Sequence, residues 1–122
     1  MGKQILLITG SPRDRWSQLV RDITERDKNV LTVVEPDYVK ARINGQAFSD
    51  TDFDLTLVDS STITGAADIV STLHSLSVSK EIVVLTAAPG WRQAREMFHA
   101  GADGYRFKSY DANELRNFLV LG

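Results

Sequence analysis

Short apolar runs alternate with amphipathic stretches along the chain. The runs are rich in β-branched and other apolar residues and hold few charges, which is typical of strands buried in a parallel sheet. The expected strands are residues 5–8, 30–34, 53–59, 81–86 and 104–108. We expect residues 53–59 to form a central strand, and Asp59 to stand where its apolar run ends.

Apolar residues recur at helical spacing between these runs, which predicts helices that pack one face on the sheet. The expected buried faces are Trp16, Leu19, Val20 and Ile23; Ile69, Val70, Leu73 and Leu76; Ala94, Met97 and Phe98; and Leu115, Phe118 and Leu119. The expected start signals are Ser11 with Pro12 for the first helix, Thr62 or Thr64 for the third, and Asp111 with Glu114 for the last. Gly101 is expected to end the fourth helix in a left-handed conformation.

Residues 37–52 allow two interpretations. Tyr38, Val39 and Ile43 fit a short helix that ends before Gly45, whereas Asn44 and Gly45 together form a good hairpin turn. The helix is favoured because strands and helices alternate on both sides of this segment, and parallel strands need a crossover between them.

The alternation predicts an α/β fold in which five strands and five helices form a doubly wound, three-layer sandwich. Because the strands are parallel, the carboxyl ends of all of them lie along one edge of the sheet, and right-handed crossovers distribute the helices over its two faces. The strand-end residues expected there are Thr9, Gly10, Ser11, Asp59, Thr86 and Lys108. A carboxylate, a hydroxyl and an ammonium at one edge are suited to holding or transferring a phosphoryl group. The simpler alternative is that Asp59 caps a turn with Ser60 and Ser61.

The composition and charge of the chain disfavour several classes of function. The 122 residues are 43% hydrophobic and 25% charged, which fits one globular domain, and the net charge of −2 argues against a nucleic-acid-binding surface. The chain has no cysteine, and its two histidines, His74 and His99, are far apart, so we expect no disulfide and no zinc site. No apolar run is long enough for a membrane helix and the start does not resemble a signal peptide, so a cytoplasmic location is expected.

Three motifs resemble those of the receiver domains of bacterial two-component signalling. They are Leu-Val-Asp at 57–59, Val-Leu-Thr-Ala at 84–87, and Ala-Gly-Ala-Asp-Gly-Tyr-Arg-Phe-Lys at 100–108. The resemblance covers nearly the whole chain and implies the flavodoxin-like strand order 2-1-3-4-5. It also implies that Asp59 is at the phosphoacceptor position, Thr86 at that of the switch hydroxyl, Tyr105 at that of the switch aromatic, and Lys108 at that of the conserved lysine.

The chain departs from the family after the first strand, where two acidic residues normally help to bind magnesium. Thr9 and Gly10 stand there instead, which leaves Asp59 and the backbone carbonyl of Ser61 as expected ligands. Asp14 is expected inside the first helix and is not regarded as a replacement. We therefore expect weak magnesium binding if any, and no other cofactor.

Two further departures fall near the same edge, since Ile63 and Ser109 stand where the family has prolines. The sequence leaves three functional hypotheses. The first is a pseudo-receiver, an interaction module that is phosphorylated poorly. The second is a working receiver, phosphorylated on Asp59 by a histidine kinase, and the third is a small nucleotide- or flavin-binding domain suggested by Thr9, Gly10 and Ser11. Beyond self-phosphorylation on Asp59, no enzymatic activity is expected.

The resemblance also predicts partners. A histidine kinase or another signalling protein is expected, together with an output domain in a longer chain from which residues 1–122 are excised. The surface formed by the fourth helix, fifth strand and fifth helix is predicted to bind a partner or a second copy weakly, because arginines and aromatics are enriched at interfaces. Its expected residues are Arg92, Arg95, Tyr105, Arg106 and Tyr110. No membrane and no direct nucleic-acid contact are expected.

Overall fold

The computed structural model describes residues 2–43 and 53–121. This part of the chain contains a five-stranded parallel sheet with the order β2-β1-β3-β4-β5. The strands are β1 (Gln4–Ile8), β2 (Val30–Val34), β3 (Leu55–Asp59), β4 (Ile82–Thr86) and β5 (Gly104–Phe107). The helices are α1 (Arg15–Arg26), α2 (Pro36–Ile43), α3 (Ala66–Ser75), α4 (Trp91–Ala100) and α5 (Ala112–Leu121), with a short 3₁₀ helix η1 (Ser60–Thr62) after β3. The predicted doubly wound fold and its strand order are confirmed.

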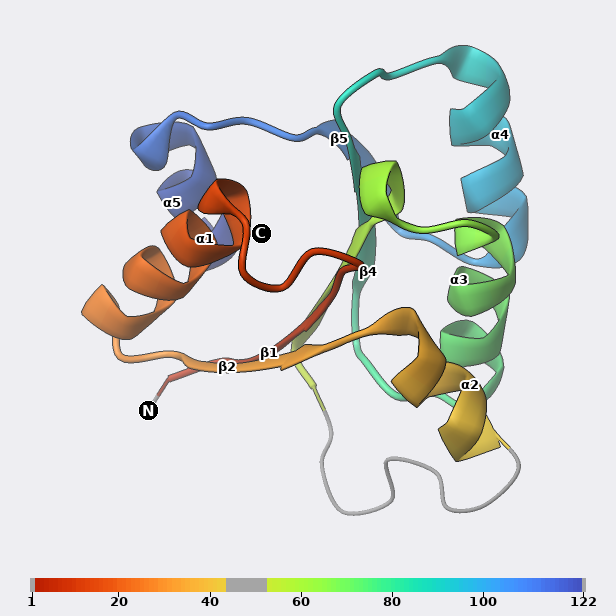
Figure 1. Cartoon of the computed structure of the whole chain (residues 1–122), viewed down its shortest axis with the longest axis horizontal. Coiled ribbons are helices and arrows are strands. Elements are labelled where there is room, and N and C mark those ends of the chain that lie inside the picture. Colours follow the sequence, from red (N-terminus) through yellow and green to blue (C-terminus); the bar gives the residue numbers. More distant parts are fainter. Residues whose placement is uncertain (1, 44–52, 122) are drawn as a thin grey trace.

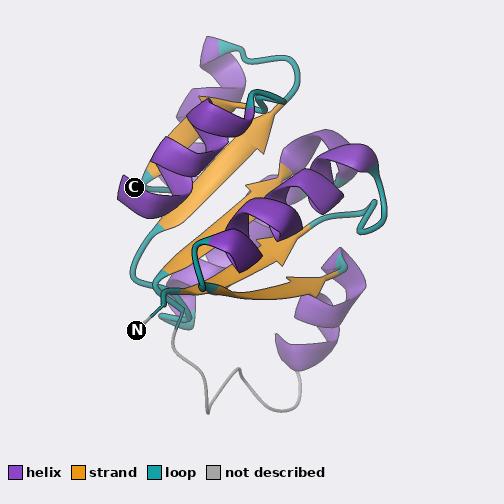
Figure 2. Cartoon of the chain, turned by 90° about the vertical axis from the view of Figure 1, so that its left-hand side faces the viewer, coloured by secondary structure: helices purple, strands orange, loops and turns teal. Residues whose placement is uncertain are grey.

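The helices form one layer on each face of the sheet. Helices α1 and α5 cover one face, while α2, α3 and α4 cover the other (Figures 1 and 2). Alternation along β1 divides its side chains between two cores: Ile5 and Leu7 pack with α1 and α5, and Leu6 and Ile8 pack with the other three helices. Every residue of β1 from Ile5 on is buried, as expected for a strand covered on both faces.

Strand β3 lies between β1 and β4, and all five of its residues are buried. In the parallel register, Ile8 is opposite Val58 and Asp59 is opposite Leu85. The residues that follow β1, β3 and β4 therefore meet at one edge of the sheet, and η1 folds over this edge directly after Asp59.

Two predicted helix starts are wrong. Helix α1 begins at Arg15 with Asp14 as its N-cap, because the Asp14 carboxylate accepts the backbone N–H of Ser17 at 2.8 Å. The Ser11 carbonyl accepts the Asp14 N–H at 3.1 Å, so the chain turns before the helix begins. Helix α3 is capped by Gly65, whose φ of 75° is left-handed, and not by Thr62 or Thr64.

The predicted buried faces are correct except at two residues. Leu76, which is the C-cap of α3, is 39% exposed, and Phe98 in α4 is 48% exposed. Gly101 ends α4 with a φ of 119°, as predicted. The Asp111 carboxylate accepts the N–H groups of Asn113 and Glu114, but the Glu114 carboxylate accepts the Ser109 hydroxyl instead of completing a capping box.

The favoured interpretation of the second crossover is confirmed, since α2 is a helix that ends at Ile43. The alternative hairpin turn at Asn44 and Gly45 lies outside the described residues. In the part of the chain that the structure describes, no helix combines the length and the apolar character required to cross a membrane.

Candidate functional site

Asp59 is fully buried at the carboxyl end of β3. One carboxylate oxygen, Oδ2, accepts the Thr9 hydroxyl at 3.0 Å and the Lys108 ammonium at 3.0 Å. The other oxygen, Oδ1, has no hydrogen-bond partner among the described residues. The structure therefore brings together three of the strand-end residues predicted from the sequence, one from each of β1, β3 and β5.

The side chain of Lys108 is 5% exposed and lies between β3 and the start of α1. Its Nζ is 4.8 Å from the centre of the Trp16 ring and 4.0 Å from Oδ2 of Asp14. Both residues belong to the start of α1, and the sequence analysis missed them: it treated Trp16 as a core residue and placed Asp14 within the helix. A cap residue directly before an apolar periodic stretch was the available signal for Asp14.

Thr62 joins the β1–α1 loop to η1. Its hydroxyl accepts the Gly10 N–H at 2.9 Å, lies 3.1 Å from the Thr9 hydroxyl, and donates to the Asp59 carbonyl at 3.1 Å. The loop also approaches η1 closely, because a Cβ atom on Gly10 would lie 2.2 Å from the Thr62 carbonyl oxygen. We call these contacts the Thr9–Thr62 clasp; it joins the loop after β1 to η1 next to Asp59.

Within the described residues, no hydrogen bond joins the side chain of either switch position to Asp59. Thr86 is buried at the end of β4, and its hydroxyl accepts the Ala88 N–H at 3.2 Å. Tyr105 is half-buried; its hydroxyl donates to the Gln93 side chain and accepts the Gly90 N–H at 3.1 Å. The Tyr105 ring is thus tied to the start of α4. The Ser61 hydroxyl accepts the Ala87 N–H at 2.7 Å, which joins η1 to the loop after β4.

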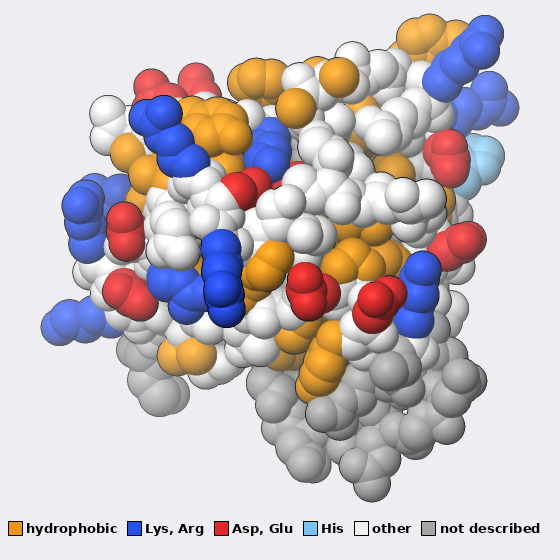
Figure 3. Space-filling model, viewed as in Figure 1, with side chains coloured by type: hydrophobic (Ala, Val, Ile, Leu, Met, Phe, Trp, Pro, Cys, Tyr) orange, Lys and Arg blue, Asp and Glu red, His pale blue; other side chains and the backbone are white. Residues whose placement is uncertain are grey.

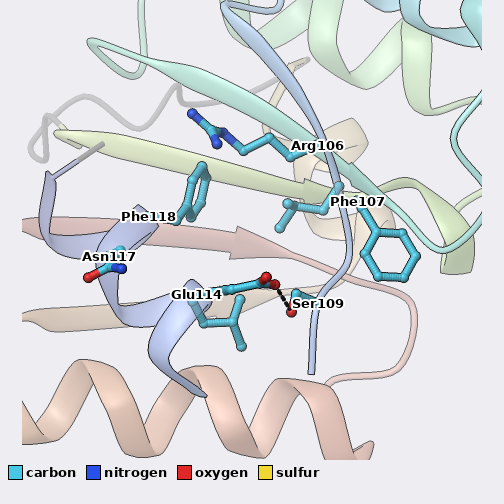
Figure 4. Close-up of a pocket in the computed structure, with 8 residues that line it drawn as sticks. Arg106, Phe107, Ser109, Glu114, Asn117 and Phe118 are labelled. Atoms are coloured by element: carbon cyan, nitrogen blue, oxygen red, sulfur yellow. Dashed lines mark hydrogen bonds between the residues drawn. The ribbon is translucent and has the colours of Figure 1, made fainter. Parts of the chain in front are cut away.

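The predicted interaction surface flanks β5, the edge strand of the sheet. Arg106 extends toward α5, where its guanidinium lies 4.9 Å from the centre of the Phe118 ring. Both residues line a groove of about 560 Å³ between β5 and α5 (Figure 4). On the other side, Arg92 lies 5.5 Å from the Trp91 ring centre, and Trp91 is 70% exposed. Hydrophobic and basic side chains gather over the start of α4 at the upper right of Figure 3.

A scan of the sequence against protein-family models finds no match, and a search of the curated proteins finds no relative. Solved structures do match the fold. A response regulator from Thermotoga maritima has a TM-score of 0.76 and 14% identity, with 97% of this chain and 94% of that chain covered. A CheY-like receiver domain protein from Methanospirillum hungatei has a TM-score of 0.73 and 18% identity, with 94% and 88% covered.

An orphan response regulator of H. pylori, HP1043, has a TM-score of 0.73 and 18% identity, with 98% of this chain and 92% of that chain covered. At these identities the likeness concerns the fold. The chain therefore has the fold of response-regulator receiver domains, and its function is inferred from the site.

Proposed function

We propose that this chain is a receiver-type signalling domain that acts as a protein-interaction module and is phosphorylated poorly on Asp59. The observation that carries the proposal is the state of the Asp59 carboxylate. It is fully buried, and one of its oxygens is bonded to both Lys108 and Thr9. A carboxylate attacks a phosphodonor only when a lone pair is accessible, and here the Asp59 side chain is not exposed to solvent.

The residues around Asp59 do not fit a magnesium ion. Magnesium requires a near-octahedral shell of oxygen ligands, normally with carboxylates among them. The Thr9 hydroxyl already donates to Asp59, and an acidic side chain at Gly10 would collide with the Thr62 carbonyl. The described residues contain no group of three or more His, Cys, Asp and Glu side chains that could hold a metal ion. We therefore expect little magnesium binding through Asp59 and the Ser61 carbonyl.

The second candidate function is a working receiver phosphorylated on Asp59 by a histidine kinase. It is favoured by the Oδ1 atom of Asp59, which has no partner among the described residues and so keeps its lone pairs. The third hypothesis, a nucleotide- or flavin-binding domain, has less support. The amino end of α1 is occupied by the Asp14 carboxylate, which disfavours a bound anion.

Incubation with a small phosphodonor and millimolar magnesium, followed by intact-mass measurement, tests the proposal. We expect only a small fraction of acyl phosphate. Stoichiometric modification that disappears in Asp59→Asn would overturn the proposal and establish the working receiver instead.

Thr9→Asp is expected to raise magnesium affinity and phosphorylation together, because it adds a hard oxygen ligand beside Asp59. Thr64→Asp is the matched control, since it adds the same charge at an exposed residue in the loop after η1. A rise in both variants would mean that net charge, and not a ligand at residue 9, limits metal binding.

A signalling protein, such as a histidine kinase, and an output domain are the partners that this proposal implies. The contact surface would be that of α4, β5 and α5, where Trp91, Phe107 and Tyr110 are each more than half exposed. Large exposed aromatics beside arginines are the residue types that dominate binding energy at interfaces.

A further inference from the structure

We propose that Asp14 and Trp16 are positioning residues that hold the Lys108 ammonium on Asp59, so that this lysine is the resident cation of the site. The inference rests on the proposed function, because it explains how the Asp59 carboxylate is compensated by the chain itself. We call the Asp14 carboxylate and the Trp16 ring face the lysine seat.

The Lys108 ammonium is surrounded by protein groups that replace its water. A lysine ammonium is strongly hydrated and loses most of its water when 5% of the side chain remains exposed. Its Nζ donates to Asp59 Oδ2 at 3.0 Å, which uses one of its three N–H groups. The Trp16 ring face at 4.8 Å and the Asp14 carboxylate at 4.0 Å supply negative potential on its other sides.

Trp16 contacts the segment directly after β5 at two points. Its indole N–H donates to the Ser109 carbonyl at 2.9 Å, directly after the lysine in the chain. The same ring carries the Lys108 ammonium on its face. Because Trp16 is fully buried, the ring is fixed by packing, and it holds both the Ser109 carbonyl and the head group of Lys108.

The Asp14 side chain is also fixed in position. Its Oδ1 accepts the Ser17 N–H at the start of α1, which leaves Oδ2 directed toward Lys108. The lysine seat thus consists of the N-cap and first turn of α1, the lysine directly follows β5, and its main partner ends β3. A change in the position of α1 would therefore alter the charge compensation of Asp59.

Competitive acylation of the lysines, quantified by peptide mass spectrometry, tests the seat directly. Lys40 and Lys80 are exposed and serve as internal references. We expect Lys108 to react much more slowly than both, and to react about tenfold faster once either side of the seat is removed. The two variants are Asp14→Asn, which can still cap α1 but lacks the charge, and Trp16→Phe, which lacks the indole N–H and leaves only a smaller, weaker ring face for the ammonium.

Asp27→Asn is the matched control, because it removes a carboxylate at the other end of α1 that pairs with Arg116. An unchanged Lys108 rate in both seat variants, or an equal rise in Asp27→Asn, overturns the proposal. If the acylation rate of Lys108 rises in only one of the two variants, the residue changed in the other variant does not hold the lysine. If Trp16→Phe fails to fold, Asp14→Asn decides, since its side chain is 32% exposed.

The labelling test is independent of the phosphodonor test. A fast-reacting Lys108 in the wild-type chain would overturn the lysine seat even if Asp59 accepted no phosphate. Stoichiometric phosphorylation of Asp59 would overturn the proposed function even if Lys108 remained protected in the unphosphorylated protein.

Discussion

Lys108 and Asp59 form a buried ion pair, whereas Lys80 and Asp54 form an exposed one. Lys108→Ala leaves a buried carboxylate without its cation, so we expect it to lower the free energy of unfolding by about 3 kcal/mol. Lys80→Ala removes a pair whose lysine is 78% exposed and is expected to cost less than about 1 kcal/mol. Chemical denaturation of both variants measures the difference.

Asp59→Asn should cost less than Lys108→Ala, because the amide oxygen still accepts the Thr9 hydroxyl and Lys108 keeps its contacts with Asp14 and Trp16. Equal denaturation midpoints for Lys108→Ala and the wild type would show that the pair is solvated or broken in solution.

Asp54 is expected to make the stability of the fold depend on pH in the acid range. The Gln4 backbone N–H, which it accepts at 2.9 Å, and the Lys80 ammonium at 3.3 Å hold the pKa of Asp54 below its ordinary value of 3.8. A carboxyl whose pKa is lowered by folding contributes stability above its unfolded pKa, and this contribution is lost as the pH falls through the folded value. We therefore expect Asp54→Asn to lose stability at neutral pH and to depend less on pH below 3.8.

Thermal unfolding of Asp54→Asn between neutral and strongly acidic pH measures this effect. Asp22→Asn, on the exposed side of α1, is the control. Parallel curves for wild type and Asp54→Asn below 3.8 would contradict the assignment.

At the residue scale, the sequence analysis predicted the meeting of Thr9, Asp59 and Lys108 because each follows a strand of a parallel sheet. It missed Asp14 and Trp16 because a helical stripe does not specify which end of a side chain faces a charge. Trp16 is a core residue, as predicted, and the same ring also binds an ammonium.

The loop between β1 and α1 depends on Gly10. In Gly10→Ala the new Cβ would lie 2.2 Å from the Thr62 carbonyl, so the backbone of the loop or of η1 must move. We expect a loss of about 1–3 kcal/mol, as for other overpacked sites. Gly90→Ala is the matched control, because a Cβ there meets nothing within 4 Å. Equal denaturation midpoints for the two variants would mean that the clasp is open in solution.

The same geometry explains why caps were harder to predict than helices. The apolar periodicity specifies a helix over many residues, but its first residue is decided by competition among nearby hydroxyls and carboxylates. Thr62 was a good candidate cap for α3, yet its hydroxyl binds Gly10 and Asp59 instead. These partners come from β1 and β3, so their approach depends on tertiary structure that no local pattern specifies.

For the whole molecule, the alternation of strands and helices was sufficient to predict three layers, because right-handed crossovers and short connections allow few topologies. The partner that binds to the surface of the molecule could not be predicted in the same way. Exposed residues such as Trp91 and Phe107 carry no periodic signal, since neither is required by the core. Their significance depends on a partner surface that the sequence of one chain does not contain.

The edge strand β5 predicts how the molecule associates. Within the described residues β5 pairs only with β4, so its outer edge has no strand partner. Arg106 and Phe107, the last two residues of β5, are exposed. A free strand edge flanked by aromatics and arginines favours pairing with another chain. We expect weak self-association in sedimentation experiments at high concentration, with or without phosphodonor. Arg106→Glu should shift the protein to monomer by removing the guanidinium over Phe118 and reversing the charge.

Lys40→Glu makes the same change of charge on α2, which packs against α3. Helix α2 follows β2, and β2 lies at the opposite edge of the sheet from β5. The substitution should leave the sedimentation profile unchanged, because the association that we predict is local to the β5 edge and not a response to net charge. A shift to monomer in both variants would indicate general electrostatics. Strictly monomeric profiles for the wild type and Arg106→Glu would remove self-association, and the surface of α4, β5 and α5 would then remain a candidate only for a different protein.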